Sequence, residues 1–282
     1  MQIIHTPAEL RSALKAQTSV AFVPTLGNLP AGHIHLVEIA KQHTHCVVAS
    51  VFVNPLQFGA NEDLASYPRT LDADCEKLQA AGTTIVFAPS VTEIYPEPQT
   101  MTINPPPIAN ELCGASRPGH FMGVVTVVLK LFNMVQPQVV VFGKKDFQQL
   151  FIIRQLVKQF NLPIEIIAGE TIREKDGLAM SSRNGYLNAS ERALASQLNS
   201  ALQSIAKAVE NCNKNFVEIE NQTALQLNQN GWVVDYISIR SATTLKPASL
   251  LDHDLVVLGA AKLGKTRLID NIEFCAKPLN GL

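Results

Sequence analysis

Two serines and an arginine stand side by side in the segment DGLAMSSRNGYL. Ser181 and Ser182 carry hydroxyl groups and Arg183 carries a planar guanidinium, and all three groups bind phosphate oxygens. The segment lies where the character of the sequence changes, and a cleft between domains is a common place for a substrate. A polar linker is the plain alternative, and these residues alone favour neither interpretation.

A second cationic group occurs in VVVFGKKDFQQL. Gly143 closes an apolar run typical of a buried strand, and Lys144, Lys145 and Asp146 follow it before a helical pattern. Two ammonium groups beside a carboxylate at a helix start suit the phosphates and ribose of a nucleotide. Taken alone, the segment is explained more simply by an aspartate N-cap with solvated lysines.

A glycine-containing turn with a histidine precedes the first long helical pattern, in PTLGNLPAGHIHLV. Gly27 and Gly32 allow the backbone to approach a ligand closely, and His33 lies at the expected helix start, where free amides attract phosphate. A tight strand-to-helix connection with a surface histidine explains this turn equally well.

Uncharged amides follow the next apolar run, in VFVNPLQFG. Asn54 and Gln57 carry the donors and acceptors that recognise hydroxyl groups and carboxylates. The alternative is turn formation at Asn54–Pro55, which is common for this dipeptide.

The elements that must position these groups alternate between two kinds. Strand-type runs and helical patterns follow one another; the strands are expected at 19–24, 46–53, 83–89, 138–143 and 164–169, and the helices at 33–42, 72–82, 119–136 and 146–160. Such alternation predicts an α/β fold with a doubly wound parallel sheet covered on both faces. Ligands bind such sheets at the carboxyl ends of the strands, where the strand order reverses.

The character of the sequence changes after about residue 185. Amphipathic helices are expected at 190–211 and 216–229, and antiparallel-type strands at 232–240 and 254–271. This order predicts a smaller α+β domain at the C-terminus. We expect one domain over residues 1–178 and a second over residues 179–282.

The bulk properties exclude several classes of protein. The 282-residue chain has a net charge of −1, which argues against binding nucleic acid through a broad basic field. Its five cysteines show no C-x-x-C spacing, so neither a zinc site nor a disulfide framework is indicated. The opening MQIIHTPAEL lacks the regions of a signal peptide, and no apolar run is long enough to span a membrane. We therefore expect a cytoplasmic protein without nucleic-acid or membrane partners.

Taken together and in this order, these motifs resemble pantothenate synthetase, the pantoate–β-alanine ligase family. The resemblance rests on PTLGNLPAGHIHLV, SVFVNPLQFG, EDLASYPRTLDADCEKL, GASRPGHFMGVVTVVLKLFNMVQP, FGKKDFQQL and DGLAMSSRNGYL, and it weakens through VDYISIR and RLIDN. It implies a Rossmann-like nucleotidyltransferase domain that binds ATP and pantoate, a C-terminal lid domain and a homodimer. It also implies a step in coenzyme A synthesis: with ATP and Mg²⁺, pantoate forms pantoyl adenylate, and β-alanine converts this to pantothenate.

The same resemblance implies roles for individual residues. His33, Lys145 and Arg183 are the expected catalytic residues. The expected ATP contacts are Leu26, Gly27, His33, Gly143, Lys144, Lys145, Asp146, Ile172, Met180, Ser181, Ser182 and Arg183. The expected pantoate contacts are Asn54, Gln57 and Gln149. No metal ligand is assigned.

Three positions depart from the family pattern. Pro30 stands where the first histidine of an H-x-G-H turn belongs, Lys144 replaces a glutamate, and Met122 replaces an arginine. Losing one preorganised donor can lower a rate by about 10²–10³-fold. A weakened paralogue that binds nucleotide or pantoate therefore remains an alternative to the active ligase. A nucleotidyltransferase that releases its adenylylated product is another.

Overall fold

The chain folds into two compact units. The computed structural model describes residues 1–59, 62 and 64–276. The N-terminal unit contains Met1–Lys144 and Gln148–Thr171, and the C-terminal unit contains Lys145–Phe147 and the chain from Ile172 onward. The division therefore falls at Thr171/Ile172 rather than at the expected 178/179. The reason is local, because Arg173 binds Asp270 of the last strand through two hydrogen bonds of 2.7 and 2.9 Å.

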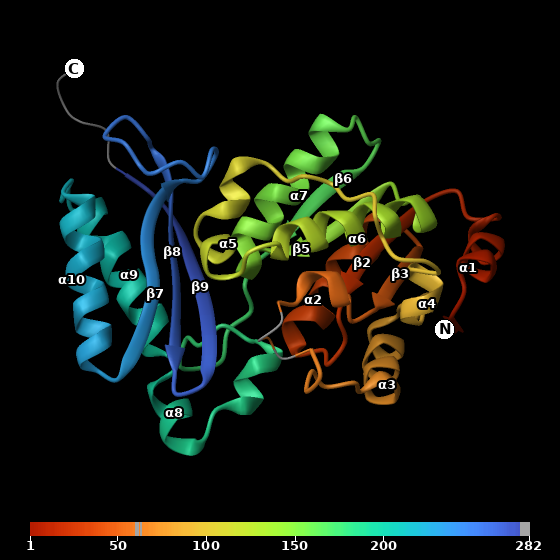
Figure 1. Ribbon diagram of the computed structural model, residues 1–282, viewed down its shortest axis with the longest axis horizontal. Helices are drawn as coiled ribbons and strands as arrows, with labels where there is room; N and C mark the ends of the chain where they lie inside the picture. The colour runs from red at the N-terminus through yellow and green to blue at the C-terminus, as the bar shows by residue number, and fades with distance from the viewer. Residues whose placement is uncertain (60–61, 63, 277–282) are drawn as a thin grey trace. The chain divides into compact units, whose positions relative to one another are not determined.

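The N-terminal unit is built on a six-stranded sheet with the order β1-β4-β3-β2-β5-β6. All neighbouring strands in it run parallel. The strands are β1 (Gln2–Ile4), β2 (Val20–Thr25), β3 (Cys46–Val51), β4 (Ile85–Phe87), β5 (Val139–Gly143) and β6 (Glu165–Gly169). The expected doubly wound parallel sheet is confirmed (Figure 1).

Helices cover both faces of this sheet. They are α1 (Pro7–Leu14), α2 (Ala31–His43), α3 (Leu71–Ala81), α4 (Val91–Ile94), α5 (Cys113–Ser116), α6 (His120–Val135) and α7 (Phe147–Gln159), with short 3₁₀ turns η1 (Pro55–Gln57), η2 (Pro107–Asn110) and η3 (Lys144–Asp146). Side chains along a strand alternate between faces. Accordingly Phe22 joins the core beneath α1, α6 and α7, whereas Ala21 joins the core beneath α2 and α3.

The strand order reverses between β2 and β5. From β2 the chain builds β3 and β4 to one side, and from β5 it builds β6 to the other. The carboxyl ends at this point are Thr25 and Gly143, followed by the β2–α2 turn and by η3. In open α/β sheets this is where a crevice for ligands forms. Both motifs expected at the site from the sequence thus leave adjacent strands.

The C-terminal unit is a three-stranded antiparallel sheet, β7-β8-β9, backed by helices. Its elements are η4 (Ser182–Tyr186), α8 (Ala189–Leu194), α9 (Gln197–Glu210), α10 (Phe216–Gln229), β7 (Trp232–Ser241), β8 (Asp254–Leu263) and β9 (Thr266–Cys275). The apolar faces of α9 and α10 and the sheet form one core around Leu202, Trp232 and Val257. The expected smaller α+β unit is confirmed. The helix expected over 190–211 is interrupted between α8 and α9.

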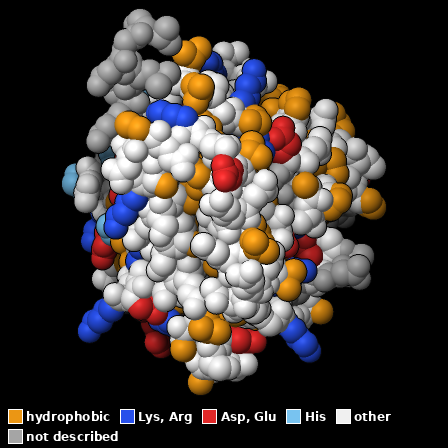
Figure 2. Space-filling view, turned by 90° about the vertical axis from the view of Figure 1, so that its left-hand side faces the viewer, with side chains coloured by type: hydrophobic (Ala, Val, Ile, Leu, Met, Phe, Trp, Pro, Cys, Tyr) orange, Lys and Arg blue, Asp and Glu red, His pale blue; other side chains and the backbone are white. Residues whose placement is uncertain are grey.

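The surface and the cysteines agree with the bulk composition. In Figure 2, hydrophobic side chains are dispersed among polar ones, and Lys and Arg stand in small groups rather than in one broad field. No disulfide joins the five cysteines, all of which lie in the described part of the chain. No helix within the described ranges combines the length and the hydropathy needed to cross a membrane.

Candidate active site

The β2–α2 turn is held from below by a buried carboxylate. Asp74, fully buried in the first turn of α3, accepts hydrogen bonds from the backbone amides of Asn28 (2.7 Å) and Leu29 (2.8 Å). Gly27 has a φ of +88°, and a Cβ there would lie 3.0 Å from Val51 and 3.2 Å from Asp74. The two turn amides are therefore engaged by the protein, and the phosphate contacts expected from this turn must come from other donors.

The first turn of α2 follows directly and is another source of backbone donors. Pro30 is the N-cap residue, with a φ of −72° and a ψ of 168°, and no side chain caps the helix. Its first turn also contains no acidic residue. An uncapped first turn leaves backbone amides and the positive end of the helix dipole for an anion. His33 follows as a half-buried residue of this turn. Proline is well accommodated here, since its fixed φ suits a position that needs no N–H.

Asn54 and Gln57 lie together after β3, but their polar atoms are used differently. Asn54 is completely buried and donates to Gln57 Oε1 (3.1 Å) and to the Gly123 carbonyl (3.2 Å). Its own oxygen accepts from Leu56 N (3.3 Å) and from the Tyr95 hydroxyl (2.8 Å). Within the described residues, Gln57 Nε2 has no protein partner, and Gln57 is 8% exposed. Gln57 can therefore contact a substrate, whereas Asn54 serves the protein.

A similar division separates two consecutive glutamines at the start of α7. Gln148 is 3% exposed and binds the carbonyls of Ile108 (2.8 Å) and Glu111 (2.9 Å). Gln149 is half-buried, and its amide has no hydrogen bond to any described residue. The expected pantoate contact is thus the glutamine whose donors remain available.

Lys144 follows Gly143 at the end of β5 and turns to the neighbouring strand. Its ammonium lies 2.6 Å from a carboxylate oxygen of Glu170, the residue after β6. Glu170 is 74% exposed, so this pair is weak by the standard of surface ion pairs. Lys144 reaches a carboxylate here, and the idea that it replaces the missing histidine at position 30 stays a prediction.

Lys145 belongs to the C-terminal unit through its backbone. The side chain of Asn271, on β9, donates to the Lys145 carbonyl at 2.9 Å. The Lys145 ammonium itself has no partner within the described residues, and the side chain is half-buried. Asp146, the last residue of η3, is exposed. A cation with an anchored backbone and an unengaged head is suited to a phosphate.

The segment 172–183 is fastened to the same strand. Within it, Met180 pairs with Ile172, because Met180 N donates to the Ile172 carbonyl at 2.9 Å. Arg173 binds the carboxylate of Asp270, which is 5% exposed, and also donates to the Gly177 carbonyl at 3.0 Å. Bidentate arginine–carboxylate pairs are geometrically specific. Adjacent residues of β9, Asp270 and Asn271, thus hold both expected ATP-binding segments of this unit.

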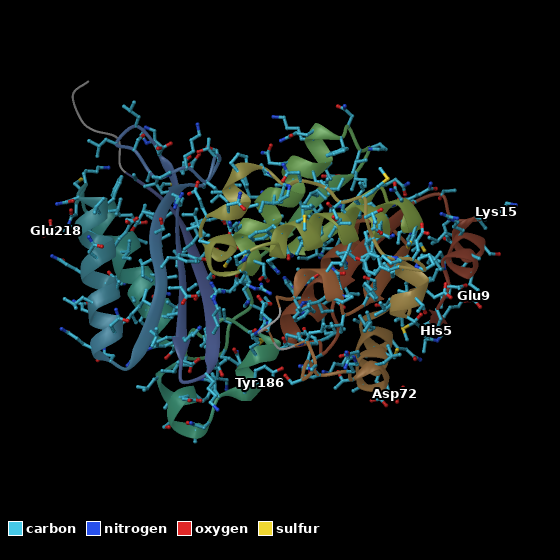
Figure 3. All side chains as sticks on the ribbon, in the orientation of Figure 1. His5, Glu9, Lys15, Asp72, Tyr186 and Glu218 are labelled. Atoms are coloured by element: carbon cyan, nitrogen blue, oxygen red, sulfur yellow. The ribbon has the colours of Figure 1, made fainter. Side chains whose placement is uncertain are left out.

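The expected phosphate-binding cluster begins η4, which ends at Tyr186 in Figure 3. Ser181 is its N-cap residue, and its hydroxyl accepts from Arg183 N at 3.2 Å. The Ser182 hydroxyl has no partner within the described residues. All three side chains are half-buried. The three residues are consecutive in one turn, so their side-chain donors project from the same short stretch of backbone.

Three residues that hold the expected site segments were not singled out from the sequence. Asp74 holds the β2–α2 turn in the N-terminal unit, and Asp270 and Asn271 hold the segments of the C-terminal unit. For Asp270 and Asn271 the available signal was a pair of short polar residues within the run TRLIDNIEF. Leu26 follows β2 directly, and its contact with ATP stays a prediction.

The parallel sheet, with polar groups after β2, β3 and β5, defines a class, the α/β proteins whose ligand crevice lies at the carboxyl edge of the sheet. Comparison with known proteins gives the family. The family model for pantoate–β-alanine ligase matches residues 2–273, and the chain belongs to this family.

Relatives and solved structures agree with that assignment. The chain is 66% identical to a pantothenate synthetase of Methylobacillus flagellatus, covering 97% of this chain and 99% of the relative. A pantothenate synthetase of Thiobacillus denitrificans is 58% identical, with 97% of each chain covered. The Thermus thermophilus pantothenate synthetase structure has a TM-score of 0.91 at 42% identity, covering 96% of this chain and 99% of that one. A Francisella tularensis pantoate–β-alanine ligase, complexed with β-γ ATP and β-alanine, has a TM-score of 0.82 at 35% identity, covering 96% and 97%.

Proposed function

We propose that the protein condenses pantoate with β-alanine to give pantothenate, with ATP as the energy source. The family model and the identities support this activity. The observation that carries the proposal is the state of Lys145, whose carbonyl is bound by Asn271 while its ammonium has no described partner. An anchored, unengaged cation beside the carboxyl end of β5 suits the triphosphate of ATP.

The reaction is proposed to have two steps. A pantoate carboxylate oxygen attacks the α-phosphorus of ATP. The bond from this phosphorus to the oxygen that bridges to the β-phosphorus breaks, and pyrophosphate leaves with the electron pair. The amine of β-alanine then attacks the acyl carbon and loses a proton, and AMP leaves. The first step is needed because a carboxylate would otherwise have to expel oxide, whereas AMP is a far better leaving group. The protein must bring two anions together, so most of its task is neutralising charge and orienting the reactants.

The residue roles are those that the family pattern implies, and the side chains present have the matching chemistry. Lys145, Ser182 and Arg183 bind the phosphates, assisted by Ser181 and by the first turn of α2 with His33. Gln57 and Gln149 bind pantoate through their amide groups. The ribose contacts are assigned to Gly143 and Asp146, and an adenine contact to Ile172. Leu26, Gly27, Lys144 and Met180 are further proposed ATP contacts.

Mg²⁺ has no dedicated protein cage in this proposal. Within the described ranges there is no cluster of three or more His, Cys, Asp or Glu residues that would hold a metal. The described residues therefore do not fit a protein-bound ion of that kind, and no step is assigned to one. Mg²⁺ commonly keeps several waters and binds through substrate phosphates, so ATP itself would carry it.

A weakened paralogue, the alternative suggested by Pro30, has no observation in its favour beyond that residue. Pro30 caps no amide, so a histidine in its place would add a donor without removing a hydrogen bond. We expect Pro30→His to raise kcat for adenylation. We also expect His33→Ala to abolish nearly all activity. The homodimer and the cytoplasmic location remain predictions.

One experiment separates the three candidate activities. The protein is mixed with ATP, pantoate and β-alanine, and AMP, pyrophosphate and pantothenate are followed together. Pantothenate formed in equal amount with AMP is the expected result, with ¹⁸O from the pantoate carboxylate recovered in AMP. Release of a free adenylate would indicate a nucleotidyltransferase, and binding without turnover would indicate the weakened paralogue. Absence of ¹⁸O from AMP would exclude an acyl adenylate.

A further inference from the structure

The side chain of Gln57 has only one orientation compatible with its neighbours. Asn54 Nδ2 donates to Gln57 Oε1, so the oxygen of Gln57 faces Asn54 and its N–H₂ group faces away. The orientation of Asn54 is itself determined by the backbone. Leu56 N can only donate, and it contacts Asn54 Oδ1. The Gly123 carbonyl can only accept, and it contacts Asn54 Nδ2. Reversing either amide would therefore set donor against donor.

Tyr95 secures the far end of this chain of contacts. Its hydroxyl donates to Asn54 Oδ1 at 2.8 Å. The Lys130 ammonium lies 4.8 Å from the centre of the Tyr95 ring and donates to Gln99 Oε1 at 2.7 Å. Burial raises the pKa of the Tyr95 hydroxyl, so it stays protonated and acts as a donor at neutral pH.

His120 holds the backbone of the same glutamine. It is 9% exposed, and its Nδ1 lies 2.8 Å from the Gln57 carbonyl. Arg117 Nη1 lies 2.9 Å from His120 Nε2, and its other nitrogens bind Glu62 at 2.8 and 2.5 Å. Arginine has no acceptor, so Nε2 carries the lone pair and Nδ1–H donates to the carbonyl. Backbone and side chain of Gln57 are thus both constrained.

We propose that Tyr95, Asn54 and His120 are positioning residues that present the N–H₂ group of Gln57 as a donor to an oxygen of the hydroxy acid. The proposal rests on the proposed function. It replaces the earlier expectation that Asn54 contacts pantoate, because the polar atoms of Asn54 are engaged by the protein. A donor held in place before the substrate arrives loses less entropy on binding. The N–H₂ group of Gln57 would thereby select a substrate that carries a hydrogen-bond acceptor at this position, either a carboxylate or a hydroxyl oxygen.

The test is a double-mutant cycle on steady-state kinetics of pantothenate formation. Tyr95→Phe removes the hydroxyl that donates to Asn54. Asn54→Asp replaces the N–H₂ group that donates to Gln57 by an oxygen, so the Gln57 amide should rotate and point its own oxygen toward the substrate. We expect both to raise KM for pantoate, the latter by about 10-fold or more, while KM for ATP is unchanged. In a Gln57→Ala background, Tyr95→Phe should produce no further change. Tyr236→Phe, in the C-terminal unit, is the control and should alter neither constant.

Substitutions of His120 provide a second, independent test. His120→Asn keeps a donor near the position of Nδ1 and should preserve KM for pantoate, whereas His120→Ala should raise it. Thermal melts identify any variant that fails to fold, and the cycle then relies on Tyr95→Phe. Equal effects of Tyr95→Phe with and without Gln57, or equal rises in KM for ATP and pantoate, would overturn the positioning roles. If the wild-type protein makes no pantothenate, the proposed function itself has failed.

Discussion

Gly123 allows α6 to touch the turn that carries Gln57, and replacing it with alanine tests this contact directly. A Cβ at Gly123 would lie 2.2 Å from the Leu56 carbonyl oxygen and 2.7 Å from Gln57 N. Real Cβ atoms stay at least 3.0 Å from such neighbours, so the backbone of η1 must move by roughly 0.8 Å.

Two effects of Gly123→Ala oppose one another. In an unhindered helix interior, glycine to alanine stabilises by about 1 kcal/mol. Overpacking against backbone costs about 1–3 kcal/mol, so we expect a net loss of up to about 2 kcal/mol. The displacement should matter more for activity, because misplacing a substrate contact by about 1 Å can cost about 10²-fold. We expect kcat/KM for pantoate to fall by about 10- to 100-fold, with KM for ATP unchanged.

The assay combines a thermal melt with pantoate titrations at saturating ATP. Gly185→Ala is the matched control, since a Cβ there meets nothing within 4 Å. The control should keep both its melting temperature and its KM for pantoate. A Gly123→Ala protein with a raised melting temperature and full pantoate kcat/KM would refute the close approach of α6 to η1.

Three further substitutions have expected outcomes. Asp74→Asn keeps one acceptor for the turn amides of Asn28 and Leu29, and it should destabilise by about 1–3 kcal/mol in urea denaturation and raise KM for ATP. Asp72→Asn, on the exposed side of α3 (Figure 3), should do neither. Asn271→Ala frees the Lys145 carbonyl and should raise KM for ATP severalfold while KM for pantoate stays constant. Burial raises the pKa of Glu220, so the folded state favours its protonated form, and the stability this gives is lost as pH rises through the raised value. Glu220→Gln keeps an acceptor and should therefore raise the melting temperature at pH 7, with the gain vanishing as pH falls below 4.5.

Each of these expectations has a contradicting result. Equal stability of the two aspartate variants would mean that the turn does not depend on the buried carboxylate. Parallel rises in KM for both substrates would show that Asn271 supports the fold in general rather than Lys145. A melting-temperature gain for Glu220→Gln that is the same at pH 4 and pH 7 would exclude the titration of this carboxyl as its cause.

Periodicity predicted most of the fold, and the site predicted from the polar residues at strand ends stays a prediction. The runs around Phe22 and Val48 are apolar on both faces, which is the pattern required of strands in a sheet that is covered by helices on both sides. The short β1 and α1 were not predicted, because a three-residue strand carries too little pattern. The interruption between α8 and α9 also has no glycine or proline to mark it.

The sequence shows the type of each polar residue but not which of its atoms are engaged by the protein itself. By residue type and position alone, Asn54 and Gln57 are alike, as are Gln148 and Gln149, and only the resemblance to the family selected Gln149. The difference arises from distant partners, among them Tyr95 and the Gly123 carbonyl, that occupy one member and leave the other available. Tertiary contacts of this kind leave no local pattern.

The route of the chain through the two units constrains how the protein can be divided. Lys145–Phe147 follows β5 and includes the first residue of α7, yet it belongs to the C-terminal unit, so the chain crosses between units at Lys144/Lys145, at Phe147/Gln148 and at Thr171/Ile172. A fragment starting at Ile172 would lack the segment that Asn271 binds. Exchange of the chain from Ile172 onward between homologues would therefore pair Asn271 of one protein with the Lys145–Phe147 segment of another.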